Sequence, residues 1–133
     1  MGSAENKKLV EAIFTELAKG NAGPFVDAMA DDFQWKLMGR KTWTQSFDGK
    51  EAVLRDLFGL LQSRLEGNII TTAQRIIADG DSVAVEARGS CRTKTGQSYN
   101  NAYCFVFRLE GGKLKEVHEY MDTELASATF GDA

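Results

Sequence analysis

The sequence predicts an α+β domain in which helices pack against one face of a curved antiparallel sheet. Two observations predict it: the first half of the chain shows helical periodicity, and the second half alternates like β-strands separated by turn signals. Helices followed by strands, rather than alternating with them, are typical of this fold class. With 133 residues, the chain has the length of one domain, so we expect a single domain over residues 1–133.

Three helices and a short strand are expected in the first half. Residues 3–20 form an amphipathic pattern because leucine and isoleucine recur every four residues. Pro24 suits the start of a short second helix that ends at the acidic pair 31–32. Residues 33–38 alternate like a short strand. A third helix is expected to begin at Asp48, which a glutamate follows three residues later in a capping-box-like pattern.

The second half predicts four long strands. They are rich in β-branched and aromatic residues and cover residues 69–78, 82–93, 98–109 and 114–123. Short glycine-containing segments separate each strand from the next, as in hairpins. Three hairpins in succession predict an antiparallel meander.

The composition excludes several classes of function. One histidine and two cysteines cannot complete a multi-histidine or cysteine-rich zinc site, and we expect neither a metal ion nor a cofactor. The net charge of −3 comes without a basic stripe, which argues against a nucleic-acid partner. No apolar run approaches the roughly 18 residues that span a bilayer. The cysteines are interpreted as reduced thiols, so we expect a cytoplasmic protein that does not bind membranes.

The last predicted strand carries a candidate catalytic set, His118, Tyr120 and Asp122, on one face. The opposite face carries Val117, Glu119 and Met121. His118 and Asp122 lie about 13 Å apart on a strand and cannot pair directly, whereas Tyr120 can reach either. An Asp122 that faces an aromatic cavity would have a raised pKa, as a general base or acid needs. The alternatives are an Asp122 carboxylate bonded to neighbouring backbone or a helix terminus, and a structural His118.

The preceding strand offers a candidate pocket lining. One of its faces carries Tyr99, Asn101, Tyr103, Phe105 and Phe107. The two phenylalanines are interpreted as core. Tyr99, Asn101 and Tyr103 are different because buried hydroxyl and amide groups need partners or a solvated cavity. They predict a pocket with a few convergent polar tips.

A loop segment in the first half offers a candidate pocket mouth. Trp35 and Trp43 flank Arg40, and Phe47 follows. The aromatic side chains would exclude water and hold a ligand, and Arg40 would favour an anionic or carbonyl-bearing one. The tryptophans equally fit plain packing, and Arg40 equally fits a loop arginine without a role.

The order of these segments resembles the NTF2-like superfamily, and within it the SnoaL-like, ketosteroid-isomerase-related branch, over about residues 5–126. The residues that carry the resemblance are Trp35 and Gly39, Phe47-Asp48-Gly49-Lys50, Val85-Glu86, Gly96 through Tyr103, Phe105-Val106-Phe107, Gly112-Lys113-Leu114 and Glu119-Tyr120-Met121-Asp122-Thr123. The resemblance implies a cone-shaped, mixed sheet wrapped around three N-terminal helices, with a pocket between helices and sheet. It also implies a homodimer formed through the outer face of the sheet.

The resemblance carries over functional residues unevenly. Asp122 matches the position of a catalytic aspartate in SnoaL-type cyclases and limonene-epoxide-hydrolase-like enzymes, which implies that Tyr120 and His118 line the pocket. The Arg-x-Asp of the hydrolases is replaced by Ala87-x-Gly89. The ketosteroid isomerases use an aspartate as their base, and the matching position here falls near residues 35–36, which hold no carboxylate. A hydrolase triad and steroid isomerisation are therefore not expected.

The same resemblance implies which residues face outward. Glu86 and Arg88 would lie on the outer face, with Cys91 pointing inward and Cys104 outward, too far apart in direction for a disulfide. The implied dimer surface places Glu86 and Arg88 beside Ala102, Cys104, Val106, Val117 and Met121.

Two functions of different classes follow. The first is proton-transfer chemistry without a cofactor (an isomerisation, an aldol-type cyclisation or a water addition) on a small apolar carbonyl compound. Asp122 would move the proton, and Tyr103, Tyr120 or His118 would hydrogen-bond the oxyanion. The alternative is a non-catalytic ligand-binding or accessory domain that uses the same pocket. A third alternative is a protein-interaction dimer whose pocket is filled by side chains.

Overall fold

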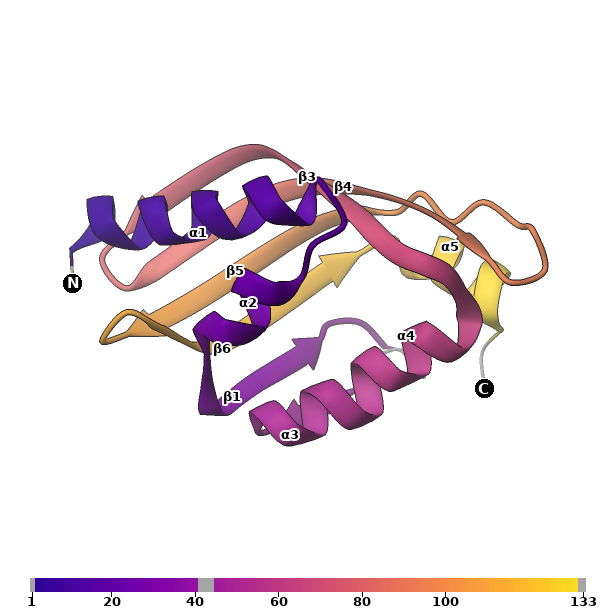
Figure 1. Cartoon of the computed structure of the whole chain (residues 1–133), viewed down its shortest axis with the longest axis horizontal. Coiled ribbons are helices and arrows are strands. Elements are labelled where there is room, and N and C mark those ends of the chain that lie inside the picture. The colour runs from indigo at the N-terminus through magenta and orange to yellow at the C-terminus, as the bar shows by residue number, and fades with distance from the viewer. Residues whose placement is uncertain (1, 41–44, 132–133) are drawn as a thin grey trace.

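The chain folds into helices on one face of a six-stranded sheet, followed by a C-terminal helix (Figure 1). The computed structural model describes residues 2–40 and 45–131. In chain order the elements are α1 (Ser3–Leu17), α2 (Gly23–Ala28), β1 (Met29–Leu37), β2 (Ser46–Asp48), α3 (Lys50–Ala52), the π-helical segment η1 (Val53–Phe58), α4 (Gly59–Arg64), β3 (Leu65–Asp79), β4 (Ser82–Thr93), β5 (Ala102–Glu110), β6 (Lys113–Met121) and α5 (Thr123–Phe130).

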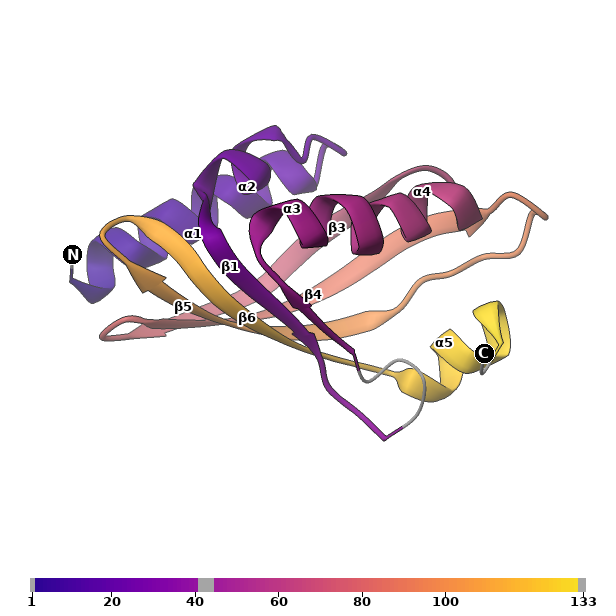
Figure 2. The same ribbon diagram turned by 90° about the horizontal axis from the view of Figure 1, so that it is seen from below.

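The sheet has the strand order β2-β1-β6-β5-β4-β3. Strands β3 to β6 form the expected antiparallel meander, and β1 joins it in parallel with β6. Seen from below, α1 to α4 cover one face of the curved sheet, and α5 continues beyond the end of β6 (Figure 2). The predicted α+β class with a mixed sheet and N-terminal helices is confirmed.

Several predicted element boundaries are wrong: the first helix ends at Leu17 rather than at residue 20, and the strand predicted over residues 98–109 begins only at Ala102. The second helix ends at Ala28 rather than at residues 31–32, because β1 already pairs with β6 at Met29. The third helix begins at Lys50, and Asp48 does not cap it. Asp48 is instead the last residue of β2, paired with β1, and the chain turns into the helix at Gly49, whose φ of 102° favours glycine.

The inner face of the sheet supplies most of the core. Phe107, Val85 and Val117 are buried there, whereas Glu86 and Arg88 are exposed on the outer face, as the resemblance implies. The last strand has the opposite facing to the predicted one. Phe105 pairs with Glu119 and Phe107 with Val117, and directly paired residues project from the same face of a sheet.

The implied dimer surface changes accordingly. Val117 and Met121 belong to the inner face, and His118 and Tyr120 take their place on the outer face beside Cys104 and Val106. Cys104 pairs with Glu86 on that outer face, and Cys91 bonds through its sulfur to the Tyr99 carbonyl. Both cysteines are free thiols.

Candidate functional site

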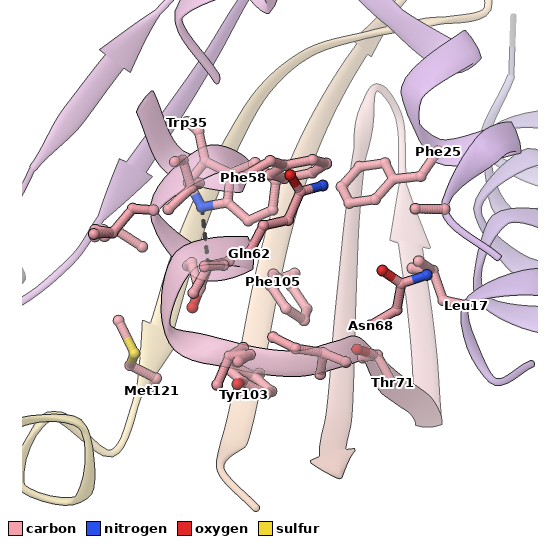
Figure 3. A pocket seen from close by; sticks show the side chains of 18 of the residues that line it. Leu17, Phe25, Trp35, Phe58, Gln62, Asn68, Thr71, Tyr103, Phe105 and Met121 are labelled. Carbon is pink, nitrogen blue, oxygen red and sulfur yellow. Dashed lines mark hydrogen bonds between the residues drawn. The ribbon is translucent and has the colours of Figure 1, made fainter. Parts of the chain in front are cut away.

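A cavity of about 180 Å³ lies between the helices and the inner face of the sheet (Figure 3). An apolar cavity of about 150 Å³ holds a molecule the size of benzene, so this one accepts a ligand of about one ring. Its wall is mainly aromatic and aliphatic; the aromatic members are Phe14, Phe25, Trp35, Phe47, Phe58, Tyr99, Tyr103, Phe105, Phe107 and Phe130. Exposed Gln62 and Asn68 contribute polar groups to the wall.

Glu119 is the carboxylic acid of this cavity. It is 7% exposed, and its Oε1 accepts a hydrogen bond of 2.9 Å from Trp35 Nε1 (dashed in Figure 3). Among the described lining residues it is the one carboxyl group, and none of them is lysine, arginine or histidine. Burial raises the pKa of Glu119 to about 7, and the hydrogen bond from Trp35 acts in the opposite direction. Near neutral pH the carboxyl can therefore both take up and release a proton.

Two tyrosines place phenol groups in the same cavity. Tyr103 on β5 pairs with Met121, two positions along the sheet from the Phe105–Glu119 pair. It is therefore a diagonal neighbour of Glu119 on the inner face. Burial raises the pKa of Tyr99 to about 12 and the pKa of Tyr103 far above its ordinary value. Both phenols therefore remain protonated and can donate hydrogen bonds at neutral pH.

Gly89 makes room for Tyr103. A Cβ built on Gly89 would lie 2.8 Å from the Tyr103 ring and 3.4 Å from its hydroxyl. The ring of Tyr103 also stacks on Phe105, with 5.2 Å between the ring centroids. A glycine on the neighbouring strand and an aromatic partner on its own strand together fix where the phenol lies.

Asn101 does not line the cavity, but its hydrogen bonds hold residues that lie at the cavity wall. Its buried amide nitrogen donates to the Tyr99 hydroxyl and to the Asp122 carbonyl, and its oxygen accepts from the backbone N–H groups of Ala102 and Asp122. The side chain thus ties Tyr99 to the junction between β6 and α5. At the other end of α5, Phe130 packs edge-on against Tyr99 at 4.7 Å between centroids.

The predicted ligand-binding residues divide into three groups. Trp35, Phe47, Tyr99 and Tyr103 line the cavity. Asn101 is buried but outside the lining, and Arg40 is exposed and does not line the cavity, so it supplies no charge to a ligand there. Trp43 lies outside the described residues.

The predicted catalytic set does not line the cavity, and this correction follows from the facing of β6. Tyr120 is 46% exposed on the outer face. His118 lies on the same face, with its Nε2 3.3 Å from Glu116 Oε1. Asp122 is exposed and caps α5, where its carboxylate accepts from Leu125 N at 3.1 Å. The alternative interpretation of Asp122, a carboxylate bonded at a helix terminus, is the one that the structure shows.

Sequence reasoning missed Glu119, although a signal was present. Glu119 alternates with Val117 and Met121, so it shares a strand face with two apolar residues. A carboxylate in the middle of an apolar face is costly to bury. It therefore marks either an exposed face or a functional position, and the register of β5 against β6 decides between them.

The part of the chain that the structure describes contains no cluster of metal-ligating side chains and no membrane-spanning helix. Residues 2–40 and 45–131 hold no cluster of three or more histidine, cysteine, aspartate or glutamate side chains suited to a metal ion. Within the same ranges, no helix has both the length and the apolar character that crossing a membrane requires.

Comparison with known families and structures places this fold in a known group. A family model described as "SnoaL-like domain" matches residues 10–117. The chain belongs to the SnoaL-like domain family. Glu119 lies just beyond the matched residues, on the strand that ends the match. The search of curated proteins finds no match to this sequence.

Solved structures agree on the fold. An NTF2-like protein from Burkholderia xenovorans is 23% identical, with a TM-score of 0.72 over 97% of this chain and 98% of that one. A candidate SnoaL-like polyketide cyclase from Jannaschia is 17% identical, with a TM-score of 0.78 over 98% of this chain and 94% of that one. A candidate isomerase from Bacillus subtilis is 14% identical, with a TM-score of 0.78 over 100% and 98% of the two chains.

Proposed function

We propose that this SnoaL-like protein catalyses proton transfer on a small, apolar carbonyl compound, with Glu119 as the acid–base group. The observation that carries the proposal is a carboxyl group, with its pKa raised to about 7, in a mostly apolar cavity of about 180 Å³. A general base works best when its pKa lies near the working pH. The names of the similar cyclase and isomerase structures agree with this class of reaction.

The proposed step uses groups that the cavity brings together. The ionised Glu119 carboxylate takes a proton from the carbon next to the carbonyl, the C–H electron pair forms a C=C bond, and negative charge moves to the carbonyl oxygen. The protonated Tyr103 phenol donates a hydrogen bond to that oxygen, with Tyr99 beside it. Such a donor, held in place before the reaction within a mostly apolar lining, stabilises the oxyanion as it forms. In a β,γ-unsaturated carbonyl compound, return of the proton from Glu119 to the γ-carbon gives the conjugated isomer. In a compound with a second carbonyl group, the enolate carbon attacks that group's carbon to close a ring, the C=O electron pair moves to its oxygen, and this oxygen takes up the proton from Glu119.

Hydrogen exchange tests this function. Cyclohexanone is a one-ring ketone of the size that the cavity accepts, and its α-hydrogens should exchange in D2O faster with protein than in buffer, as followed by ¹H NMR. We expect Glu119→Gln to lower the protein-dependent rate at least about 100-fold, because general base catalysis contributes that much. Glu116→Gln makes the same chemical change on the outer face of β6 and should keep the wild-type rate. Equal rates for Glu119→Gln and wild type would refute the proposal.

A non-catalytic ligand-binding domain is the second candidate. The observation that favours it is the lining itself, which is apolar apart from Glu119, the two phenols and a few amide and hydroxyl groups, and would hold a neutral ligand without further chemistry. Retention of a one-ring ketone in native mass spectrometry, without any exchange of its α-hydrogens, would select this candidate.

We also propose that two copies pair through the outer sheet face. Two large apolar side chains are exposed there, Ile77 at 57% and Tyr120 at 46%, and the half-buried Ala84 and Val106 lie between their strands. A two-fold pairing would cover this surface on both copies. Light scattering at micromolar concentration should give the mass of a dimer, and Tyr120→Lys should shift it toward the monomer. A wild-type monomer would refute the pairing.

A further inference from the structure

Trp35 holds an unusual position beside Glu119. It is 6% exposed on β1, and four phenylalanine rings surround it, with the centroids of Phe25 and Phe58 5.6 and 5.9 Å away. In the parallel pairing of β1 with β6, Trp35 lies opposite Val117 and Leu37 opposite Glu119. The indole therefore reaches diagonally along the inner face, and its N–H ends on Glu119 Oε1 at 2.9 Å.

We propose that Trp35 is a positioning residue for Glu119: its indole N–H holds Oε1, fixes the plane of the carboxyl group and leaves Oε2 to take up the substrate proton. This inference rests on the proposed proton transfer at Glu119. It assigns Trp35 a role besides packing and lining the cavity. A phenylalanine would fill most of the same space, but it could not donate the hydrogen bond.

The surroundings of Glu119 make this one hydrogen bond important. The titratable groups that line the cavity beside it are the phenols of Tyr99 and Tyr103, and the lining contributions of α1, α2, η1, α4, β3 and α5 contain no charged side chain among the described residues. Burial opposes ionisation of Glu119, and the Trp35 hydrogen bond favours it. Trp35 is thus the described neighbour that stabilises the ionised form, which is the form that a base needs.

The test is the titration of Glu119 in Trp35→Phe. Protein labelled with ¹³C at the glutamate side-chain carboxyl carbon gives one resonance per glutamate, and Glu119→Gln identifies the one of interest. Loss of a hydrogen bond to a charged group should move the midpoint upward by about one to two pH units. Phe33→Leu is the matched control, because Phe33 packs against Trp35 at 6.1 Å but does not line the cavity. Its midpoint should equal that of wild type.

Turnover provides the second readout. In Trp35→Phe, the midpoint of the pH profile of cyclohexanone exchange should move upward by the same amount as the Glu119 titration. Below that midpoint, kcat should fall and KM should stay close to its wild-type value. A Trp35→Phe midpoint equal to that of wild type, or an equal shift in Phe33→Leu, would overturn the positioning role. Absence of exchange in wild type would refute the proposed function instead, and the titration would still decide whether Trp35 stabilises the carboxylate.

A measurement on the unaltered side chains guards against a Trp35→Phe variant that fails to fold. With ¹⁵N-labelled tryptophan, the indole N–H resonance of Trp35, told apart from that of Trp43 by Trp43→Phe, should shift with pH at the midpoint of Glu119. The shift should vanish in Glu119→Gln. A Trp35 resonance that does not follow Glu119 in wild type would overturn the proposal.

Discussion

The two faces of β6 carry similar side chains in different surroundings. Glu119 on the inner face is buried in an apolar cavity, and its pKa is raised to about 7. Glu116 on the outer face is half-buried and lies 3.3 Å from His118. Asp122, three residues after Glu119, is exposed and caps a helix. Position on the sheet therefore decides which carboxylate is buried in the cavity and can act on a ligand there, and the type of residue does not.

The largest expected difference between the faces of the sheet is in packing. Phe107 is 1% exposed on the inner face and packs against Phe14 and Phe25. Phe107→Ala should lower the free energy of unfolding by about 3–5 kcal/mol, because it removes contacts and leaves a cavity. Arg108→Ala, next along β5 and exposed, should change it by less than about 0.5 kcal/mol. Urea denaturation measures both, and similar losses for the two variants would contradict the assigned facing.

The second difference is the pH dependence of stability that Glu119 brings. The folded protein holds the Glu119 proton up to about pH 7, whereas the unfolded chain releases it near its ordinary value of 4.5. The unfolded state therefore binds fewer protons between these values, and stability falls as pH rises through this window, by about 3 kcal/mol in total.

The variant Glu119→Gln should remove that slope. The free energy of unfolding of Glu119→Gln should equal that of wild type near pH 4 and exceed it above pH 7. Denaturation at a series of pH values measures both. Ser90→Ala, which removes no titratable group, serves as the control and should keep the wild-type slope between pH 4.5 and 7. A Glu119→Gln protein with an unchanged slope would show that another group is responsible.

A smaller effect is expected at Gly89. An added methyl group would meet the Tyr103 ring at 2.8 Å, so Gly89→Ala should cost about 1–3 kcal/mol by overpacking and slow cyclohexanone exchange by displacing the phenol. Ser90→Ala, on the outer face at the next position, should leave both quantities close to wild type. Exchange that is unaffected by Gly89→Ala would argue against Tyr103 as the hydrogen-bond donor.

The smallest effect is expected at Asp122. Asp122→Ala removes the cap of α5 and should cost about 1 kcal/mol, whereas Asp122→Ser keeps a capping oxygen and should cost less. Neither variant should slow the exchange of cyclohexanone, because Asp122 lies outside the cavity lining. Exchange lost in Asp122→Ala at unchanged stability would return the role of base to Asp122.

Much of the fold could be predicted because its signals are local. The strand predicted at residues 82–93 matches β4 at both ends, and the first helix starts where the periodicity starts. The outward facing of Glu86 and Arg88, which the family resemblance and not a local signal implies, is also confirmed. The parallel pairing of β1 with β6 has no local signal, because it joins residues such as Trp35 and Val117 that are far apart in the chain.

The candidate site is predicted less well, since it depends on the phase of one strand. A change of one residue in facing exchanges every side chain of β6 between cavity and outer surface. The predicted phase therefore puts His118, Tyr120 and Asp122 inside, and Glu119 outside. Trp35 and Tyr103 line the cavity as expected, because their strand faces are clearly apolar and aromatic, and Tyr99 lines it from the segment before β5.

By itself, the sequence determined the fold class, the meander and an aromatic-rich cavity lining, since periodicity and turn residues act over a few neighbours. Only the tertiary structure decided which carboxylate enters that cavity. Pairing of Phe105 with Glu119 and of Leu37 with Glu119 brings the acid between two strands and under the helices. Burial there raises its pKa, and the indole of Trp35, from a distant part of the chain, supplies its hydrogen bond.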